Sequence, residues 1–150
     1  MNYKDPFDKR VSQETAQKQF EEYCDNLSIK YYKYGIDNHP FGSKLYKANR
    51  IVRNTPDYFI LKGDPCFVEV KSCSEILRMK LLDFDSYDFW NKLMKVFYCI
   101  YSSELVAKLT VSHKKLKHLI SVNNYEIEQY PDAHKYDKKE YYPIPVKDLL

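Results

Sequence analysis

The sequence predicts an α/β fold in which a central mixed β-sheet is flanked by helices. Segments with helical spacing alternate with β-branched and aromatic runs, a turn cluster joins two of these runs, and no repeat or Gly/Ser-rich linker divides the chain. The chain has 150 residues, of which 44% are hydrophobic and 30% are charged, a composition typical of a globular protein. We therefore expect a single domain over residues 1–150.

The first predicted element is an amphipathic helix over residues 12–27. Ser12 is a suitable N-cap, and the helix has one apolar face formed by Ala16, Phe20, Tyr23 and Leu27. The β-branched and aromatic residues of 29–34 predict a strand, and residues 41–53 predict a loop.

A β-hairpin is the clearest local feature. Residues 58–61 and 66–70 are two strand-like runs, and the turn residues of 62–65, Lys-Gly-Asp-Pro, separate them. Residues 76–82 fit either a strand or an extended loop. A helix is expected to start within residues 85–88 and to continue with the apolar side chains of Phe89, Trp90, Leu93 and Met94.

The second half of the chain predicts two more strands and a helix. Residues 96–101 form a short apolar run typical of a buried strand, and residues 106–111 are its expected neighbour. Ser112 can cap a short helix that carries Leu116, Leu119 and Ile120. Residues 142–145 contain two prolines, which confines this segment to the edge of a sheet.

Charge and composition limit the environment of the protein. No apolar run approaches the ~20 residues that a membrane span requires, and the first residues have no apolar signal core. We therefore expect an intracellular protein that is neither secreted nor bound to a membrane. Its four cysteines do not form a C-x-x-C pair, so reduced thiols are expected.

The net charge of +3 is unevenly distributed. Between residues 30 and 53 the chain has six basic residues against one acid, Asp37, and five aromatic residues lie among them. Basic groups bind phosphates and flat rings stack on bases, so this segment is a candidate nucleic-acid contact, although a solvated lysine-rich loop explains it equally well. The candidate DNA-binding residues are Lys30, Lys33, Lys44, Lys47, Arg50 and Arg53.

The hairpin carries the residues that indicate chemistry. Asp57 lies six residues before Gly63 and Glu69 lies six residues after it, so symmetric pairing places the two carboxylates opposite each other, with Cβ atoms ~5 Å apart. Lys71 shares a strand face with Glu69 because side chains alternate along a strand.

Two opposed carboxylates repel each other, but a divalent cation between them makes the arrangement favourable. With the Lys71 ammonium beside it, such a pair suits metal-assisted phosphodiester hydrolysis. An exposed hairpin face with ordinary charges is the alternative. A second copy of the pattern, with Asp132, Asp137 and Lys139, is too short for two strands and is interpreted as coincidental.

These residues resemble the PD-(D/E)xK nuclease superfamily. Pro56-Asp57, eleven further residues and then Glu69-Val70-Lys71 match its pattern, and the surrounding strings resemble the Holliday junction resolvases of the phage endonuclease I type and the TnsA-type endonucleases. The resemblance implies a restriction-endonuclease-like core, α-β-β-β-α-β, in which the Asp and Glu bind Mg²⁺ and the Lys assists the attacking water. The long segment between Ile36 and Asn54 departs from the junction resolvases.

Members of the superfamily often add an acid from the first helix. Glu14, Glu21 and Glu22 are the candidates, and Glu14 is preferred because its distance from the next strand is closer to the family arrangement. The expected catalytic residues are Asp57, Glu69, Lys71 and Glu14. The expected metal ligands are Asp57, Glu69, Val70 and Glu14.

The resemblance implies a Mg²⁺-dependent DNA endonuclease, possibly structure-specific, in which Mn²⁺ can replace Mg²⁺. DNA is the expected partner, a homodimer is possible by analogy with the resolvases, and no small-molecule cofactor is expected. The alternatives are a non-catalytic nucleic-acid-binding module, a transposase-associated subunit that cleaves ends, and an unrelated α/β interaction domain.

Overall fold

The computed structural model describes residues 6–33, 51, 54–104, 108–130 and 139–150. A five-stranded sheet with the order β1-β2-β3-β5-β6 lies at its centre. Only β3 and β5 are parallel, so the sheet is mixed, as predicted. Its strands are β1 (Tyr31–Lys33), β2 (Tyr58–Ile60), β3 (Cys66–Cys73), β5 (Val96–Ser102) and β6 (Leu109–Ser112).

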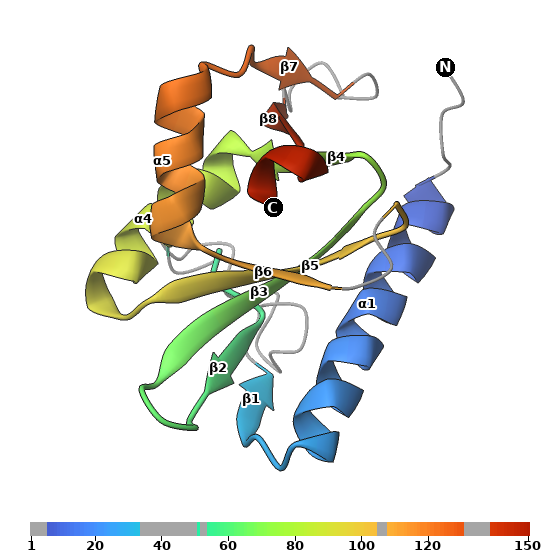
Figure 1. Ribbon diagram of the computed structural model, residues 1–150, viewed down its shortest axis with the longest axis vertical. Coiled ribbons are helices and arrows are strands. Elements are labelled where there is room, and N and C mark those ends of the chain that lie inside the picture. Colours follow the sequence, from blue (N-terminus) through green and yellow to red (C-terminus); the bar gives the residue numbers. More distant parts are fainter. Residues whose placement is uncertain (1–5, 34–50, 52–53, 105–107, 131–138) are drawn as a thin grey trace, which may run out of the picture.

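Helices cover both faces of this sheet (Figure 1). Helix α1 (Pro6–Asn26) packs on one face, and α4 (Leu81–Leu93) and α5 (His113–Asn123) lie on the other. A second, three-stranded sheet with the order β4-β8-β7 lies on the same side as α4 and α5. It consists of β4 (Ile76–Lys80), β7 (Glu128–Gln129) and β8 (Glu140–Pro145), which leads into a 3-10 helix, η2 (Val146–Leu149).

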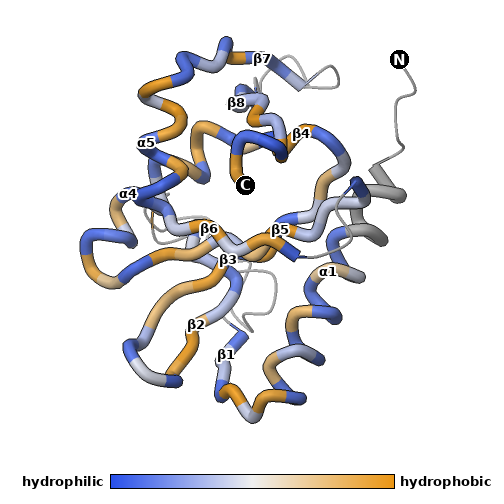
Figure 2. The backbone as a smooth tube through the Cα atoms, in the orientation of Figure 1, coloured by the Kyte–Doolittle hydropathy of each residue, from blue (hydrophilic) through white to orange (hydrophobic). Residues whose placement is uncertain are grey.

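Two apolar cores result from this layering. The smaller core joins α1 to the central sheet through Ala16, Phe20, Cys24, Tyr58, Val68, Val70 and Cys99. The larger core lies between the central sheet, the small sheet, α4 and α5, and includes Leu77, Met79, Tyr87, Tyr98, Ile100, Leu116 and Ile144. Figure 2 shows the hydrophobic stretches of β5 and β6 running through the middle of the molecule, between these two layers.

The predicted hairpin is present, and its turn contains a residue with a left-handed backbone conformation. Gly63 has φ +65°, a conformation that favours glycine over residues with a Cβ atom. The register pairs Tyr58 with Val68 and Ile60 with Cys66. One step beyond the last pair, the same register places Asp57 opposite Glu69, as the symmetric count around Gly63 predicted.

Two of the three predicted helix starts were wrong. Helix α1 begins at Pro6 instead of Ser12, and proline is favoured in the first turn because it has no N–H to leave unpaired. Helix α4 begins at Leu81 instead of within residues 85–88. Its N-cap Lys80 makes no side-chain capping bond, and Ser86 lies inside the helix, where its hydroxyl donates to the Leu82 carbonyl.

The small sheet was not predicted as a unit. Of residues 76–82, which fitted a strand or a loop, Ile76–Lys80 form β4 and the last two begin α4. Residues 142–145 lie in β8, the middle strand of the small sheet, but in the part of the chain that is described they pair with β4 alone, so this part of the strand has one edge, as its prolines predicted. The N–H of Val146 donates to the Glu75 carbonyl, so by alternation the nitrogens of Pro143 and Pro145 point away from β4. Strand β7 pairs only with Glu140 and Tyr141, so within the described residues no strand pairs with Pro143 or Pro145 on the side of β8 opposite β4.

The remaining predictions for the second half agree with the structure. The buried strand is β5, its neighbour is β6, and the Ser112 hydroxyl caps α5 by accepting from the N–H of Lys115. All four cysteines are free, as expected. The loop predicted over 41–53 lies outside the described residues except for Ile51, as does most of the second copy of the acidic pattern. Within the described residues, no helix is both long and apolar enough to cross a membrane.

Candidate active site

The hairpin brings Asp57 and Glu69 together where β2 begins. The N–H of Asp57 donates to Glu69 Oε2 at 3.0 Å, and the N–H of Val70 donates to Asp57 Oδ2 at 3.1 Å. Each carboxylate therefore accepts a hydrogen bond from the backbone of the opposite strand. This exchange fixes both side chains on the same face of the sheet, the face covered by α4.

Lys71 lies beside Glu69 on this face, as the strand alternation predicted. Its Nζ is 3.2 Å from Glu69 Oε1 and 3.3 Å from Asp83 Oδ2, and only 17% of its side chain is exposed. Asp83 is in the first turn of α4, and Asn54 Nδ2 donates to its other oxygen at 3.0 Å. The Lys71 ammonium is thus held between a carboxylate of β3 and a carboxylate of α4.

The cluster contains more acidic than basic side chains. Glu69 is 6% exposed, and burial together with the neighbouring Asp57 charge raises its pKa to about 8. Burial also raises the pKa of Asp57. The pKa of Asp83 is lowered, because Lys71 and the Asn54 hydrogen bond outweigh its burial. Three carboxylates therefore share one buried ammonium.

Lys71 is protonated in this setting. Burial acts to lower its pKa, but the charges of Glu69, Asp83 and Asp57 outweigh burial and raise the pKa above its ordinary value. The buried Tyr87 of α4 is near enough to the Glu69 carboxylate to act on its pKa in the lowering direction. An ammonium that keeps its proton can donate hydrogen bonds and stabilise negative charge, but it cannot act as a base at neutral pH.

Helix α1 reaches this part of the sheet through an amide. Gln13 Nε2 donates to the Val70 carbonyl at 2.6 Å, and Gln13 Oε1 accepts from both the N–H and the hydroxyl of Ser72 at 3.1 Å. Gln13 therefore fixes α1 to β3 next to Glu69 and Lys71. The Val70 carbonyl oxygen keeps a second lone pair, which is compatible with its predicted role as a metal ligand.

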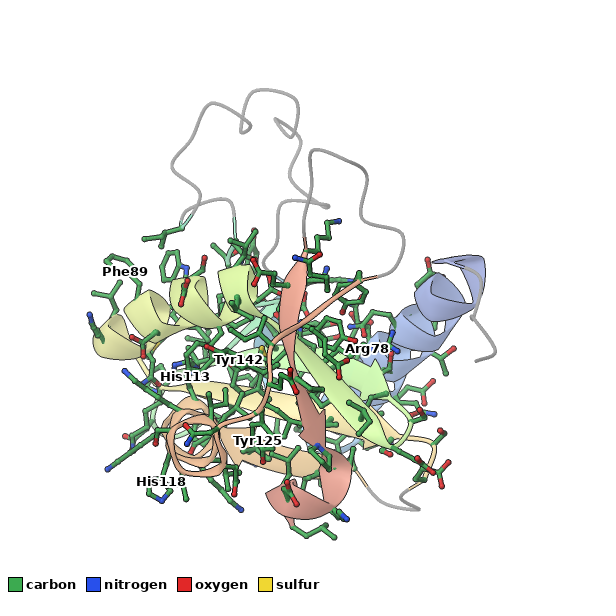
Figure 3. All side chains as sticks on the ribbon, turned by 90° about the horizontal axis from the view of Figure 1, so that it is seen from above. Arg78, Phe89, His113, His118, Tyr125 and Tyr142 are labelled. Atoms are coloured by element: carbon green, nitrogen blue, oxygen red, sulfur yellow. The ribbon has the colours of Figure 1, made fainter. Side chains whose placement is uncertain are left out.

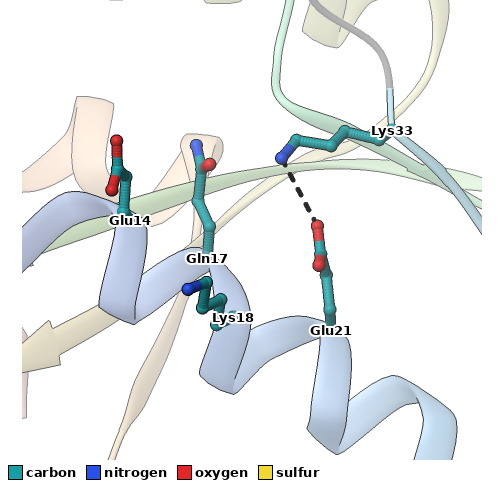
Figure 4. A pocket seen from close by; sticks show the side chains of 5 residues that line it. All are labelled: Glu14, Gln17, Lys18, Glu21 and Lys33. Atoms are coloured by element: carbon teal, nitrogen blue, oxygen red, sulfur yellow. Dashed lines mark ion pairs between the residues drawn. The ribbon is translucent and has the colours of Figure 1, made fainter. Parts of the chain in front are cut away.

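Glu14, the preferred acid of the first helix, is exposed and lines a hollow between α1 and β1 with Gln17, Lys18, Glu21 and Lys33 (Figure 4). Among the described residues, no hydrogen bond joins Glu14 to Asp57 or Glu69. Glu21 accepts from the Tyr58 hydroxyl at 2.7 Å and pairs with Lys33 at 3.5 Å, and Glu22 is exposed. Glu14 as a metal ligand stays a prediction.

The predicted basic contact is described only in part. Lys30 and Lys33 lie at β1 and are exposed, and the ammonium of Lys33 is partly compensated by Glu21. Lys44, Lys47, Arg50 and Arg53 lie outside the described residues, so their role in DNA binding stays a prediction.

Sequence reasoning missed Asp83 and Gln13. Asp83 was overlooked because the helix was expected to start two or more residues after it, which removed Asp83 from any regular element. Gln13 is not among the predicted site residues, because only the acids of the first helix were candidates there. The carboxylates and the lysine were found because the hairpin that positions them is local in sequence.

Comparison with known proteins supports the fold class. No protein-family model matches the chain, and the comparison with curated proteins finds no match. A solved structure, the Holliday junction resolvase Hjc from Archaeoglobus fulgidus, is similar with a TM-score of 0.53 and 9% identity, over 91% of this chain and 86% of that one. The structure of D212, a nuclease from a fusselovirus, gives a TM-score of 0.49 and 14% identity over 97% and 88% of the two chains.

The likeness to Hjc is a likeness of fold. The expected order of a helix, three strands, a helix and a strand is present as α1, β1, β2, β3, α4 and β5, with β4 inserted before α4. The chain therefore has a fold similar to that of Hjc, and its element order agrees with the α-β-β-β-α-β core that the sequence pattern predicted.

Proposed function

We propose that the protein is a Mg²⁺-dependent DNA endonuclease that hydrolyses phosphodiester bonds. The pair of Asp57, which is half-buried, and Glu69, which is buried, with the single ammonium of Lys71 beside it, is the observation that carries this proposal. A non-catalytic descendant of the fold would have no use for such a pair, since it destabilises the hairpin.

The donor set suits a hard divalent cation. Among the described residues, no group of three or more His, Cys, Asp or Glu side chains is arranged to hold a metal ion, so the proposal relies on the two carboxylates of Asp57 and Glu69 together with water and phosphate oxygens. Mg²⁺ binds through one or two carboxylates and keeps several waters, which fits this arrangement, and Mn²⁺ should substitute. Val70, through its carbonyl oxygen, and Glu14 are further candidate ligands. When bound, the ion would supply Lewis-acid stabilisation of the charge that develops on the phosphate.

Lys71 would act as a hydrogen-bond donor. Its ammonium is oriented by Glu69 and Asp83, so it can donate to the attacking water or to a phosphate oxygen without reorganising. Asp83 is a positioning residue in this scheme, because it holds Lys71 and does not itself face the substrate.

The type of DNA substrate follows from the comparison by analogy. Hjc resolves Holliday junctions, and its fold is similar to this one, so a branched DNA structure is the first substrate to test. A homodimer is consistent with cutting a four-way junction on two strands.

The experiment that tests this function measures cleavage of a four-way junction and of nicked, linear and single-stranded DNA, each with Mg²⁺ and with EDTA. We expect Mg²⁺-dependent cleavage by the wild type. The Asp57→Ala, Glu69→Gln and Lys71→Met proteins should each lose most activity while still binding DNA, because metal, water and charge stabilisation act as a unit.

Asp64→Ala is the matched control, since Asp64 is an exposed acid in the turn of the same hairpin. Its cleavage rate should equal that of the wild type. Full activity of the Lys71→Met protein, or cleavage by the wild type in EDTA, would contradict the proposed function.

A further inference from the structure

The small sheet presents two cations on its outer face. Along β4, Leu77 and Met79 are buried in the larger core, so by alternation Arg78 and Lys80 point to the opposite face. Figure 3 shows Arg78 on one side of β8, away from α4, and Tyr142 on the side toward α4. Both cationic side chains are half-buried.

Aromatic rings hold Arg78 in place. Its guanidinium carbon is 5.7 Å from the centroid of the Tyr130 ring and 5.4 Å from that of Tyr141, and the two rings are 4.6 Å apart. Lys80 Nζ is 6.0 Å from the Tyr130 centroid. The Tyr141 hydroxyl donates to Glu128 Oε2 at 2.7 Å. Arg78 is thus oriented by ring faces, which leave its N–H groups available.

Neither cation forms an ion pair within the described part of the chain. The ion pairs found there involve Lys33, Lys71, His113 and Lys117, and none involves Arg78 or Lys80. Arginine and lysine held on rings without a carboxylate partner form a surface suited to phosphate groups, and the planar guanidinium matches phosphate geometry.

This surface is continuous with the candidate active site. Lys80 directly precedes α4, whose first turn carries Asp83, the partner of Lys71. The charges of Asp83, Lys71 and Glu69 all act on Lys80, whose pKa is lowered chiefly by burial. Charges of Lys71 and Asp83 also reach Tyr130. A phosphate bound by Lys80 would therefore lie next to the proposed site of hydrolysis.

We propose that Arg78 and Lys80 bind the DNA backbone at phosphates that flank the cleaved bond. The inference rests on the proposed function, and it places a substrate contact on the small sheet, separate from the basic segment of residues 30–53. The rings of Tyr130 and Tyr141 keep the guanidinium of Arg78 in place before DNA arrives, which reduces the entropy lost on binding.

The test compares the salt dependence of DNA binding for matched variants, with a four-way junction and a linear duplex as probes and EDTA to prevent cleavage. Arg78→Gln/Lys80→Gln should bind both probes more weakly and reduce the slope of log K against log salt by about one unit for each lost phosphate contact. Arg78→Lys/Lys80→Arg keeps both charges and should keep the wild-type slope. Lys62→Gln/Lys95→Gln removes the same charge from exposed positions at the hairpin turn and before β5, and should change the slope little.

Thermal melting checks that every variant folds. If Arg78→Gln/Lys80→Gln does not fold, the slope of Arg78→Lys/Lys80→Arg is compared with that of the wild type. In that case a fall in its slope below the wild-type value would contradict the inference. Equal slopes for the two glutamine variants would overturn the inference, while Mg²⁺-dependent cleavage by the wild type would leave the proposed function intact. A wild type that neither binds nor cleaves DNA would overturn both.

Discussion

Replacing Asp57 by Asn should stabilise the metal-free protein. The substitution removes the half-buried charge next to Glu69 with little change of shape, and the new amide oxygen can still accept from the N–H of Val70. The pKa of Glu69 is about 8 instead of 4.5, so ionising this side chain in the folded protein costs a few kcal/mol. Burial is the larger cause, and Asp57 is the second.

We assign on the order of 1 kcal/mol of this cost to the opposed charges, which for a chain of this size is a rise in Tm of about 2–4 °C. The sign of the pH dependence follows from the raised pKa of Glu69. Because the pKa of Glu69 is higher in the folded protein than its unfolded value of 4.5, Glu69 contributes stability at pH values below 4.5. That stability is lost as the pH rises through about 8. The advantage of Asp57→Asn should therefore be largest at and above that pH and shrink in acid.

Thermal melts of wild type and Asp57→Asn with EDTA and with saturating Mg²⁺ measure this effect. In saturating Mg²⁺ the difference in Tm between Asp57→Asn and the wild type should shrink or reverse, because only the wild type gains the full binding term RT ln(1 + [L]/Kd). Asp64→Asn, the same chemical change in the exposed turn, should alter neither melt. A metal-free Asp57→Asn protein that melts below the wild type, with no response of the wild type to Mg²⁺, would refute the reasoning.

Two further predictions concern buried charge. Lys71→Met leaves Glu69 and Asp83 without their shared ammonium, so the metal-free protein should lose on the order of 3 kcal/mol in urea unfolding, and unchanged unfolding would contradict the ion-pair geometry. His113 is fully buried between the Tyr98 hydroxyl and Asp88, and burial lowers its pKa below 6.5 despite Asp88. A lowered pKa gives stability that is present above the unfolded value and is lost as the pH falls, so the difference in stability between wild type and His113→Asn should shrink on acidification. A difference that grows in acid would contradict the neutral state of His113.

The hairpin and its acidic pair could be predicted because they depend on residues close in sequence. Gly63 fixes the turn, the alternation of side chains fixes the faces, and together they determine which residue lies opposite Asp57. The capping prediction for Ser112 succeeded for the same reason, since a cap involves only the next three residues.

The parts that could not be predicted depend on distant segments. Strand β4 needs β8 as its partner, and no local pattern shows that residues 76–80 pair with residues 141–145. The start of α4 follows directly from the end of β4, so its first turn has no capping side chain to indicate it. The role of Asp83 as a partner of Lys71 therefore emerges only when the two elements are packed together.

Binding of Mn²⁺, followed by electron paramagnetic resonance of the free ion, tests the central claim most directly, namely that Asp57 and Glu69 form a metal centre. Wild type and the Asp64→Asn control should remove Mn²⁺ from solution with the same affinity, and Mg²⁺ should compete for the same site. Asp57→Asn and Glu69→Gln should each weaken this binding strongly. Equal Mn²⁺ binding by all four proteins, or none by the wild type, would contradict the account.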